Sequence, residues 1–328
     1  PHRHPPMSHP SPQAKPLIVR LRNWVGDVVL SLPALQHLQT QGYALRLIGK
    51  RWAPELLRAT GWPVEVLADN GHARQEQLQQ QRLYARGIDP GFERRVNMLL
   101  FPYSFSSAWE ARRAGLRALG FRKEGRSLLL RRSLPLLDNE HELERYWRLA
   151  TALSGDVDAR PPALLQLPLD EQARAEARQH LAAAGVDGAY TVLCPFGGGP
   201  IDGHDKHWPA FGDFARQLQR AGHTLVLCPG PDELTTARSG YDGLHVIPGL
   251  GLAAYAALIE GARQMVSNDT GPGHIAAAVG TPLLSVLGPT PVAKWRPWGP
   301  QVRVLSGWPQ WPSVDAALKA FETLPPRG

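Results

Sequence analysis

The most specific segment of the sequence is SNDTGPGHIAAAVGTPLLSVLGPT, residues 267–290. A strand ends just before a sharp turn at Thr270 and Gly271, and Pro272 suits the first helical position, where no backbone N–H is needed. Small residues then fill a short helix, and the apolar run PLLSVLG at 282–288 predicts the next strand. Strand, turn, helix and strand in this order are typical of an α/β protein with a parallel sheet.

The same alternation extends outward towards both ends of the chain. Short apolar runs are separated by stretches with helical periodicity, which predicts a parallel sheet covered on both faces. Besides 282–288, strands are expected at 17–22, 44–49, 64–69, 96–102, 190–195, 223–229, 244–249 and 262–269. Helices are expected after the first strand and at 106–120, 170–184 and 313–323.

These elements predict two doubly wound domains. Residues 1–15 are expected to form a disordered arm, residues 16–168 an N-terminal Rossmann-like domain and residues 169–328 a C-terminal one. The proline-containing stretch 154–170 has little periodicity and is the expected linker. Ligands of such sheets bind at the carboxyl ends of the strands, so functional residues are expected in the cleft between the domains.

The composition is that of a globular protein. Of the 328 residues, 43% are hydrophobic and 20% are charged. The chain has neither an apolar run long enough to span a bilayer nor a recognisable signal peptide, so we expect a cytoplasmic protein. Its two cysteines, Cys194 and Cys228, each end an apolar run and are expected to be buried and unreactive. The net charge of +7 favours anionic partners without choosing among phosphates, nucleic acid and an anionic membrane.

The turn at 269–271 has two interpretations. Free backbone N–H groups at the start of a helix bind anions, and the small residues around the turn would let a diphosphate approach the backbone. Asp269 or Thr270 is equally suited to capping an ordinary helix. These residues alone support the two interpretations equally.

Two further loops follow predicted strands. FGGGPIDGHDKHWP at 196–209 is rich in glycine and contains Lys206, which suits a mobile counter-charge for a diphosphate or is a plain surface lysine. RNWVGDVVLSLPALQHL at 22–38 contains Asp27 at the turn into a helix. A carboxylate there is able to accept a proton from an attacking hydroxyl, but local physics alone favours a helix cap.

Several motifs, in order and spacing, resemble glycosyltransferase family nine, the ADP-heptose:lipopolysaccharide heptosyltransferases. They are WVGDVVLSLPAL, DKHWP and NDTGPGHIAAAVGTP, followed after a gap by LGPT. FPYSFSSAWEARRAGLRALGFRKEGRSLLL and HELERYWRLA most resemble the second heptosyltransferase of inner-core synthesis. The resemblance covers roughly residues 16–324. It implies the GT-B fold, in which two Rossmann-like domains face each other and the C-terminal one holds the donor.

The resemblance implies an inverting transfer of heptose from ADP-heptose to the lipopolysaccharide inner core, with the ADP-sugar as substrate and no cofactor. Asp27 then matches the general base, and Lys206 matches the lysine on the donor phosphates. The other donor-binding residues are Asp232 or Glu233 on the ribose, together with Asp269, Thr270, Gly271 and His274. The sequence has no paired acidic metal motif, so catalysis is expected to be metal-independent.

The acceptor is expected on the N-terminal domain. Arg122, Lys123 and Arg126 belong to a basic stretch at 112–132 and are candidates for the phosphates of a lipid A–Kdo acceptor, and at least half of this stretch is expected to be solvated. This partner allows peripheral contact with the inner face of the bacterial inner membrane.

Three alternatives stay open. A related transferase would use another nucleotide sugar, or a protein or glycan acceptor. A sugar-nucleotide epimerase of the same architecture would turn over the donor without any acceptor. A nucleic-acid-binding protein is disfavoured, because the chain lacks RNA-binding signatures and its arginines are scattered.

Overall fold

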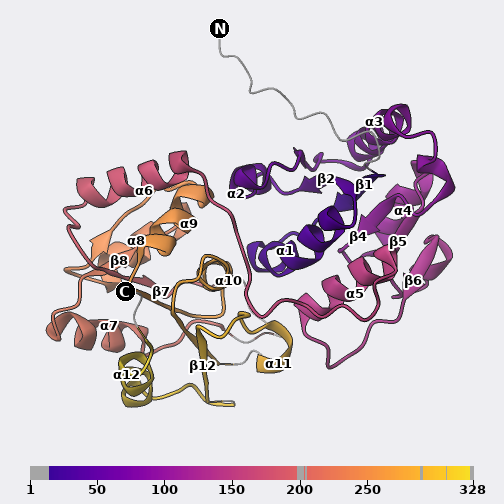
Figure 1. Ribbon diagram of the computed structural model, residues 1–328. Helices are drawn as coiled ribbons and strands as arrows, with labels where there is room; N and C mark the ends of the chain where they lie inside the picture. Colours follow the sequence, from indigo (N-terminus) through magenta and orange to yellow (C-terminus); the bar gives the residue numbers. More distant parts are fainter. Residues whose placement is uncertain (1–14, 198–202, 204, 289–290, 308, 326–328) are drawn as a thin grey trace, which may run out of the picture.

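The computed structural model describes residues 15–197, 203, 205–288, 291–307 and 309–325. The predicted arm lies outside these residues except for Lys15, which begins the first strand. The chain forms two six-stranded parallel sheets, of order β3-β2-β1-β4-β5-β6 and β12-β11-β10-β7-β8-β9 (Figure 1). Helices flank both sheets, so the expected fold of two Rossmann-like α/β units is confirmed.

The first unit carries the N-terminal sheet. Its elements are β1 (Lys15–Arg20), α1 (Val25–Thr40), β2 (Tyr43–Gly49), α2 (Ala53–Leu56), η1 (Arg58–Thr60), β3 (Val64–Val66), α3 (Gly71–Ile88), η2 (Phe92–Arg94), β4 (Met98–Leu100), α4 (Phe105–Arg113), β5 (Ala118–Phe121), η3 (Arg126–Leu128), β6 (Arg132–Leu134) and α5 (Glu142–Ser154).

The second unit carries the C-terminal sheet. Its elements are α6 (Glu171–Ala183), β7 (Thr191–Cys194), α7 (Phe211–Arg220), β8 (Leu225–Leu227), η4 (Pro231–Glu233), α8 (Leu234–Gly240), β9 (His245–Val246), α9 (Leu252–Gly261), β10 (Gln264–Ser267), α10 (Gly271–Ala278), β11 (Leu283–Leu287), α11 (Val292–Trp295), β12 (Val302–Ser306) and α12 (Val314–Glu322).

Successive side chains of β1 enter two different cores, because both faces of the sheet are covered. Leu17 and Val19 of β1 join the core under α1 and α5, whereas Ile18 between them packs into a second cluster with α3 and α4. All three side chains are inaccessible to solvent. This double burial explains why the strands are short, purely apolar runs.

The expected helix at 106–120 is too long. α4 ends at Arg113, because Gly115 adopts a left-handed φ of +75° and turns the chain into β5. β5 and β6 were not expected, and neither was β12. Cys194 and Cys228 are free and buried, as expected, and burial raises the pKa of the Cys194 thiol to about 12.

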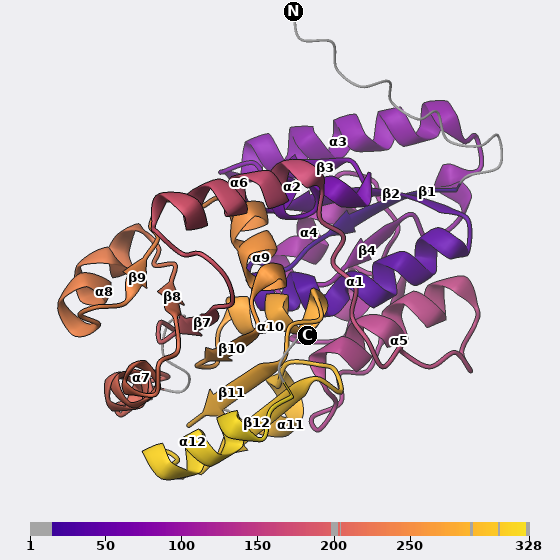
Figure 2. The ribbon, with the colours of Figure 1, turned by 60° about the vertical axis from the view of Figure 1, so that its left-hand side comes forward.

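The two units contact each other through specific pairs. Glu55 of α2 accepts a hydrogen bond from the backbone N–H of Ala253 at the start of α9, with 3.1 Å between Oε1 and N. Arg58 pairs with Asp170, the N-cap of α6, at 2.6 Å. Figures 1 and 2 both show α2 beside this region of the second unit.

The expected linker is anchored to the second unit. The backbone N–H of Leu167 donates to Ala278 of α10 at 3.0 Å, and Pro162 accepts from the Trp298 indole at 2.9 Å. The predicted domain boundary at 168/169 falls in this segment and stays a prediction. No helix among the described residues is both long and apolar enough to cross a membrane.

Candidate active site

A cavity of about 520 Å³ lies between the two units. It opens at the carboxyl ends of β1 and β10, where α1 and α10 begin. Both units contribute to its walls, which are lined by Arg22, Trp24, Val25, Gly26, Asp27, Leu30, Gly197, Lys206, Glu233, Asp269, Thr270, Gly271, Pro272, His274 and Trp295.

Two glycines let the helix starts approach each other. A Cβ atom at Gly26 would lie 2.7 Å from Cδ2 of His274, and one at Gly271 would lie 2.9 Å from Cβ of Val25. Real side chains do not tolerate such distances. Because neither glycine has a side chain, the first turns of α1 and α10 are able to lie close together on either side of one cavity.

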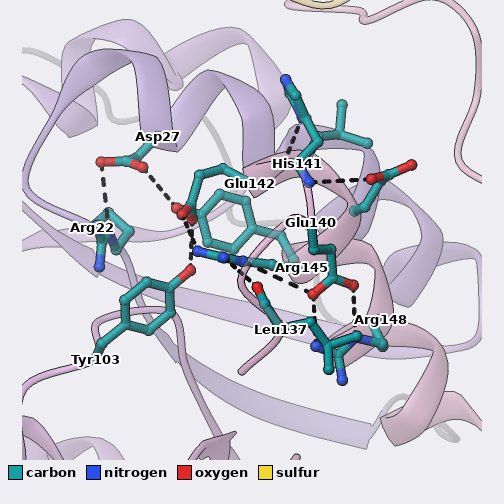
Figure 3. A network of polar contacts seen from close by, with 12 residues as sticks. Arg22, Asp27, Tyr103, Leu137, Glu140, His141, Glu142, Arg145 and Arg148 are labelled. Atoms are coloured by element: carbon teal, nitrogen blue, oxygen red, sulfur yellow. Dashed lines mark hydrogen bonds and ion pairs between the residues drawn. The ribbon is translucent and has the colours of Figure 1, made fainter. Parts of the chain in front are cut away.

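Asp27 lies in the first turn of α1 and does not cap it. The N-cap is Trp24, which makes no side-chain cap hydrogen bond, so the capping interpretation of Asp27 is wrong. The hydroxyl of Tyr146 donates to Asp27 Oδ1 at 2.8 Å. Nε of Arg22 lies 3.6 Å from Oδ2 (Figure 3).

Burial sets the proton affinity of Asp27. It raises the pKa of this carboxyl, and the positive charge of Arg22 and the hydrogen bond from Tyr146 oppose that rise in part. The Asp27 side chain is 10% exposed and lines the cavity, so a hydroxyl bound there is able to reach it. A carboxylate with a raised pKa is a better general base than an ordinary one.

A buried ionic network supports Arg22. The guanidinium of Arg22 lies 4.4 Å from the centre of the Tyr103 ring, and the Tyr103 hydroxyl donates to Glu142 at 2.6 Å. Glu142 in turn accepts from Arg145 at 2.6 Å (Figure 3). Tyr146 and this network were not predicted, although HELERYWRLA, which contains Tyr146, was noted for its resemblance.

The opposite wall carries Lys206 and Asp269. Lys206 Nζ lies 3.0 Å from Asp269 Oδ2, and both side chains are largely buried. Asn268 fixes this arrangement, because its Oδ1 accepts from the backbone N–H of the buried Trp208 at 3.3 Å. The lysine loop is thereby tied to the end of β10, which excludes the interpretation of Lys206 as a plain surface lysine.

Thr270 precedes α10, and His274 lies within it. Thr270 is the N-cap of this helix, but its side chain makes no cap hydrogen bond. His274 is buried against Gly26, and its Nδ1 has no hydrogen-bond partner among the described residues. Burial lowers the pKa of His274, with Asp269 opposing the shift, so the imidazole is neutral at pH 7.

Only one of the two acidic candidates in η4 reaches the cavity. Glu233 lines it and accepts a hydrogen bond from the backbone N–H of Gly230 at 2.8 Å. Asp232 is exposed and is not among the lining residues.

The three expected acceptor contacts differ in exposure. Arg122 and Lys123 are exposed on the loop after β5, outside the cavity lining. Arg126 is fully buried, and its Nη1 donates to the carbonyl oxygen of Pro102 at 2.6 Å. Burial lowers the pKa of Arg126 to about 10. This guanidinium holds two loops together and is not accessible to an acceptor phosphate.

A second cavity of about 550 Å³ adjoins the first through Trp24. Cationic and aromatic side chains dominate it, and sequence reasoning did not single them out. The lining residues are Asn23, Trp24, Lys50, Arg51, Trp52, Leu67, Ala68, Asp69 and Arg74. Across the part of the chain that the structure describes, no cluster of three or more His, Cys, Asp or Glu residues is arranged to hold a metal ion.

Curated relatives match parts of the chain. Lipopolysaccharide heptosyltransferase 3 of Escherichia coli K12 is 36% identical over 129 residues, which make up 37% of this chain and 37% of the relative. Lipopolysaccharide heptosyltransferase 1 of Pseudomonas aeruginosa is 31% identical over 187 residues, 54% of this chain and 48% of the relative. The chain thus spans between about a third and a half of the length of these curated relatives.

A solved structure matches over most of the chain. ADP-heptose lipopolysaccharide heptosyltransferase II of Escherichia coli superposes with a TM-score of 0.70 at 23% identity, covering 88% of this chain and 89% of that one. This likeness supports the two-unit fold. Residues 96–320, more than half of the chain, match glycosyltransferase family 9 (heptosyltransferase). The chain therefore belongs to glycosyltransferase family 9.

Proposed function

We propose that the protein transfers heptose from ADP-heptose to a hydroxyl of the lipopolysaccharide inner core, with inversion at the anomeric carbon. Family membership and the names of the relatives support this reaction. The observation that carries it is the pairing of Asp27 on one wall of the cavity with Lys206 and the start of α10 on the other.

Asp27 acts as the general base. It takes the proton of the acceptor hydroxyl while the hydroxyl oxygen bonds to the anomeric carbon, and the bond from that carbon to the diphosphate oxygen breaks. ADP leaves from the opposite face with the bonding electrons. Proton transfer requires Asp27 to lie within about 3 Å of the hydroxyl, and such a base contributes about 10²–10⁴-fold to the rate.

The second unit stabilises the leaving diphosphate. Lys206 supplies a positive charge, and the free backbone N–H groups at Thr270 and Gly271 supply oriented dipoles. Asp269 orients Lys206, and the neutral His274 beside it offers a hydrogen bond without a competing charge. Glu233 contacts the ribose hydroxyls, with Asp232 as the exposed alternative on the same turn.

The reaction needs no metal in this proposal, because Lys206 and the backbone N–H groups at the start of α10 stabilise the negative charge of the leaving diphosphate. We expect full turnover after dialysis against EDTA. A loss of activity that a divalent cation restores would contradict this part of the proposal.

The acceptor binds in the second cavity, beside the base. Lys50, Arg51 and Arg74 provide positive charge for an anionic lipid A–Kdo acceptor, while Trp24 and Trp52 offer apolar faces to its sugar rings. Arg122 and Lys123 lie further out on the same unit, where they meet more distant phosphates.

Peripheral contact with the inner face of the bacterial inner membrane brings the enzyme to this acceptor. Phe105 and Trp109, one turn apart on α4, are 46% and 48% exposed, and Leu128 of the adjoining η3 is 89% exposed. Exposed Arg112 and Arg113 lie on the same helix. We expect sedimentation with vesicles that contain phosphatidylglycerol, loss of sedimentation in Trp109→Ser, and no change in Val157→Ser, another exposed apolar residue.

The proposed function is tested by incubating the protein with ADP-heptose and a heptose-deficient lipopolysaccharide core. We expect ADP release that requires the core and a mass gain of one heptose on it. Donor conversion without any acceptor would favour an epimerase. Transfer from a different nucleotide sugar, or to a protein or other glycan, would favour the related-transferase alternative.

A further inference from the structure

The hydroxyl of Tyr146 contacts Asp27 from the interior of the protein. Its oxygen donates to Asp27 Oδ1 at 2.8 Å, although the two residues are 119 positions apart in the chain. Tyr146 is fully buried and is not among the residues that line the cavity. The hydroxyl therefore reaches the carboxylate from the side that faces away from the bound substrates.

Tyr146 is itself held in place. Its ring packs on the buried Phe101 at the end of β4, with ring centres 4.8 Å apart and planes tilted by 55°. A capping box of His141 and Glu144 fixes the start of α5, and this helix packs along α1. The position of the hydroxyl is thus set by two elements that do not depend on the substrates.

The other carboxylate oxygen is less constrained. Arg22 Nε lies 3.6 Å from Oδ2, which is longer than a hydrogen bond. Arg22 lines the cavity, its guanidinium lies over the Tyr103 ring, and the Tyr103 hydroxyl donates to Glu142 (Figure 3). Oδ2 therefore keeps its capacity to accept a proton on the cavity side.

We infer that Tyr146 is a positioning residue, which holds Asp27 by Oδ1 so that Oδ2 faces the acceptor hydroxyl as the proton-accepting atom. This inference rests on the proposed function, because it takes Asp27 as the base. The acceptor proton moves to Oδ2 as the new glycosidic bond forms, and Tyr146 keeps its own proton throughout.

The charges around Asp27 predict the direction in which its pKa changes when the Tyr146 hydroxyl is removed. Burial and the charge of Asp27 raise the pKa of Tyr146 well above its usual value, so it remains a donor at any working pH. Its hydrogen bond lowers the pKa of Asp27 against the larger effect of burial. Without the hydroxyl, the pKa of Asp27 rises further. The groups that face Asp27 are Arg22 on the loop before α1, Tyr146 and Glu142 on α5, and Lys206, Asp269 and His274 across the cavity.

The test is the pH dependence of kcat in Tyr146→Phe. The acidic limb should move to higher pH by about one unit, because a hydrogen bond to a charged group is lost. KM for ADP-heptose should stay within about twofold, since the donor groups lie on the other unit. Tyr190→Phe is the matched control, because it removes a buried hydroxyl that bonds the Leu258 carbonyl at 2.7 Å in the second unit and should leave the limb in place.

A second variant should shift the acidic limb of the kcat pH profile in the opposite direction. Incorporation of 3-fluorotyrosine at position 146 makes the hydroxyl a stronger donor, so the acidic limb should shift to lower pH, which misfolding would not produce. An unmoved limb in both variants overturns the inference even where Asp27→Asn is inactive. Full activity of Asp27→Asn would instead overturn the choice of base in the proposed function.

Discussion

The starts of α1 and α10 have similar local structures, but the aspartates they carry have different partners. Each follows a central strand of its sheet, each has a glycine where the other helix presses close, and each carries an aspartate facing one cavity. Asp269 has the ammonium of Lys206 at 3.0 Å, whereas Asp27 has a phenol at 2.8 Å and a guanidinium only at 3.6 Å.

This difference explains how two similar strand–turn–helix units have two different chemical roles. The Asp269 carboxylate lies against Lys206 and orients that cation. Burial raises the pKa of Asp27 even though the Arg22 guanidinium lies 3.6 Å away, and a carboxylate with a raised pKa suits proton transfer. Partners reached through space, rather than the strand–turn–helix motif itself, decide between the two roles.

The largest expected effect comes from Asp27→Asn. Transfer should fall by about 10²–10⁴-fold, because the amide cannot accept the proton. ADP binding, measured by thermal shift, should stay unchanged because the donor-binding groups lie on the second unit, across the cavity from Asp27. Retained turnover in a folded variant would break the comparison between the two aspartates.

The next effect comes from Lys206→Met. Removal of one electrostatic group at the leaving diphosphate should lower kcat by about 10²–10³-fold and weaken ADP binding as well. Lys319→Met, an exposed change on α12, serves as the control. If kcat and ADP affinity both stay at the wild-type level, the cavity wall that carries Lys206 does not hold the diphosphate.

Gly271→Ala should have a smaller effect. The new methyl group would press on Val25, where the Cβ–Cβ distance would be 2.9 Å, and push the two helix starts apart. We expect about a tenfold lower kcat/KM, with destabilisation of about 1–3 kcal/mol from overpacking. Gly71→Ala is the matched control, because Gly71 also begins a helix and has open space around it. Equal effects of the two changes would show that the close approach is unimportant.

The smallest effects are two shifts in Tm of opposite sign at pH 7. Because burial raises the pKa of Asp27 in the folded state, its stabilising contribution is present at low pH and is lost as pH rises through that pKa. Asp27→Asn should therefore raise Tm by about 2–4 °C. Asp269→Asn should lower Tm by a similar amount, because it removes the carboxylate that lies against the buried Lys206. Shifts of the same sign would mean that the two carboxylates have similar environments.

Local patterns predicted most of the fold, and the resemblance to the heptosyltransferases predicted the residues in the walls of the site. Periodicity located nine of the strands, and the turns after them brought Asp27, Lys206 and Thr270 into one cavity. These predictions succeeded because the carboxyl ends of parallel strands meet at one edge.

The partners of those residues could not be predicted in the same way. Tyr146 reaches Asp27 from 119 positions away, and no local pattern encodes that contact. Arg126 looked like its basic neighbours in the sequence, yet it is buried because its guanidinium bonds the Pro102 carbonyl. Strands β5 and β6 were missed because they are short and lie among arginines.

The contact of Glu55 with the start of α9 has a consequence for unfolding. A helix in one half of the molecule is completed by a carboxylate from the other half, so neither half reaches its lowest energy alone. The two halves should melt as one cooperative unit, with a single calorimetric peak in which the measured and van't Hoff enthalpies agree.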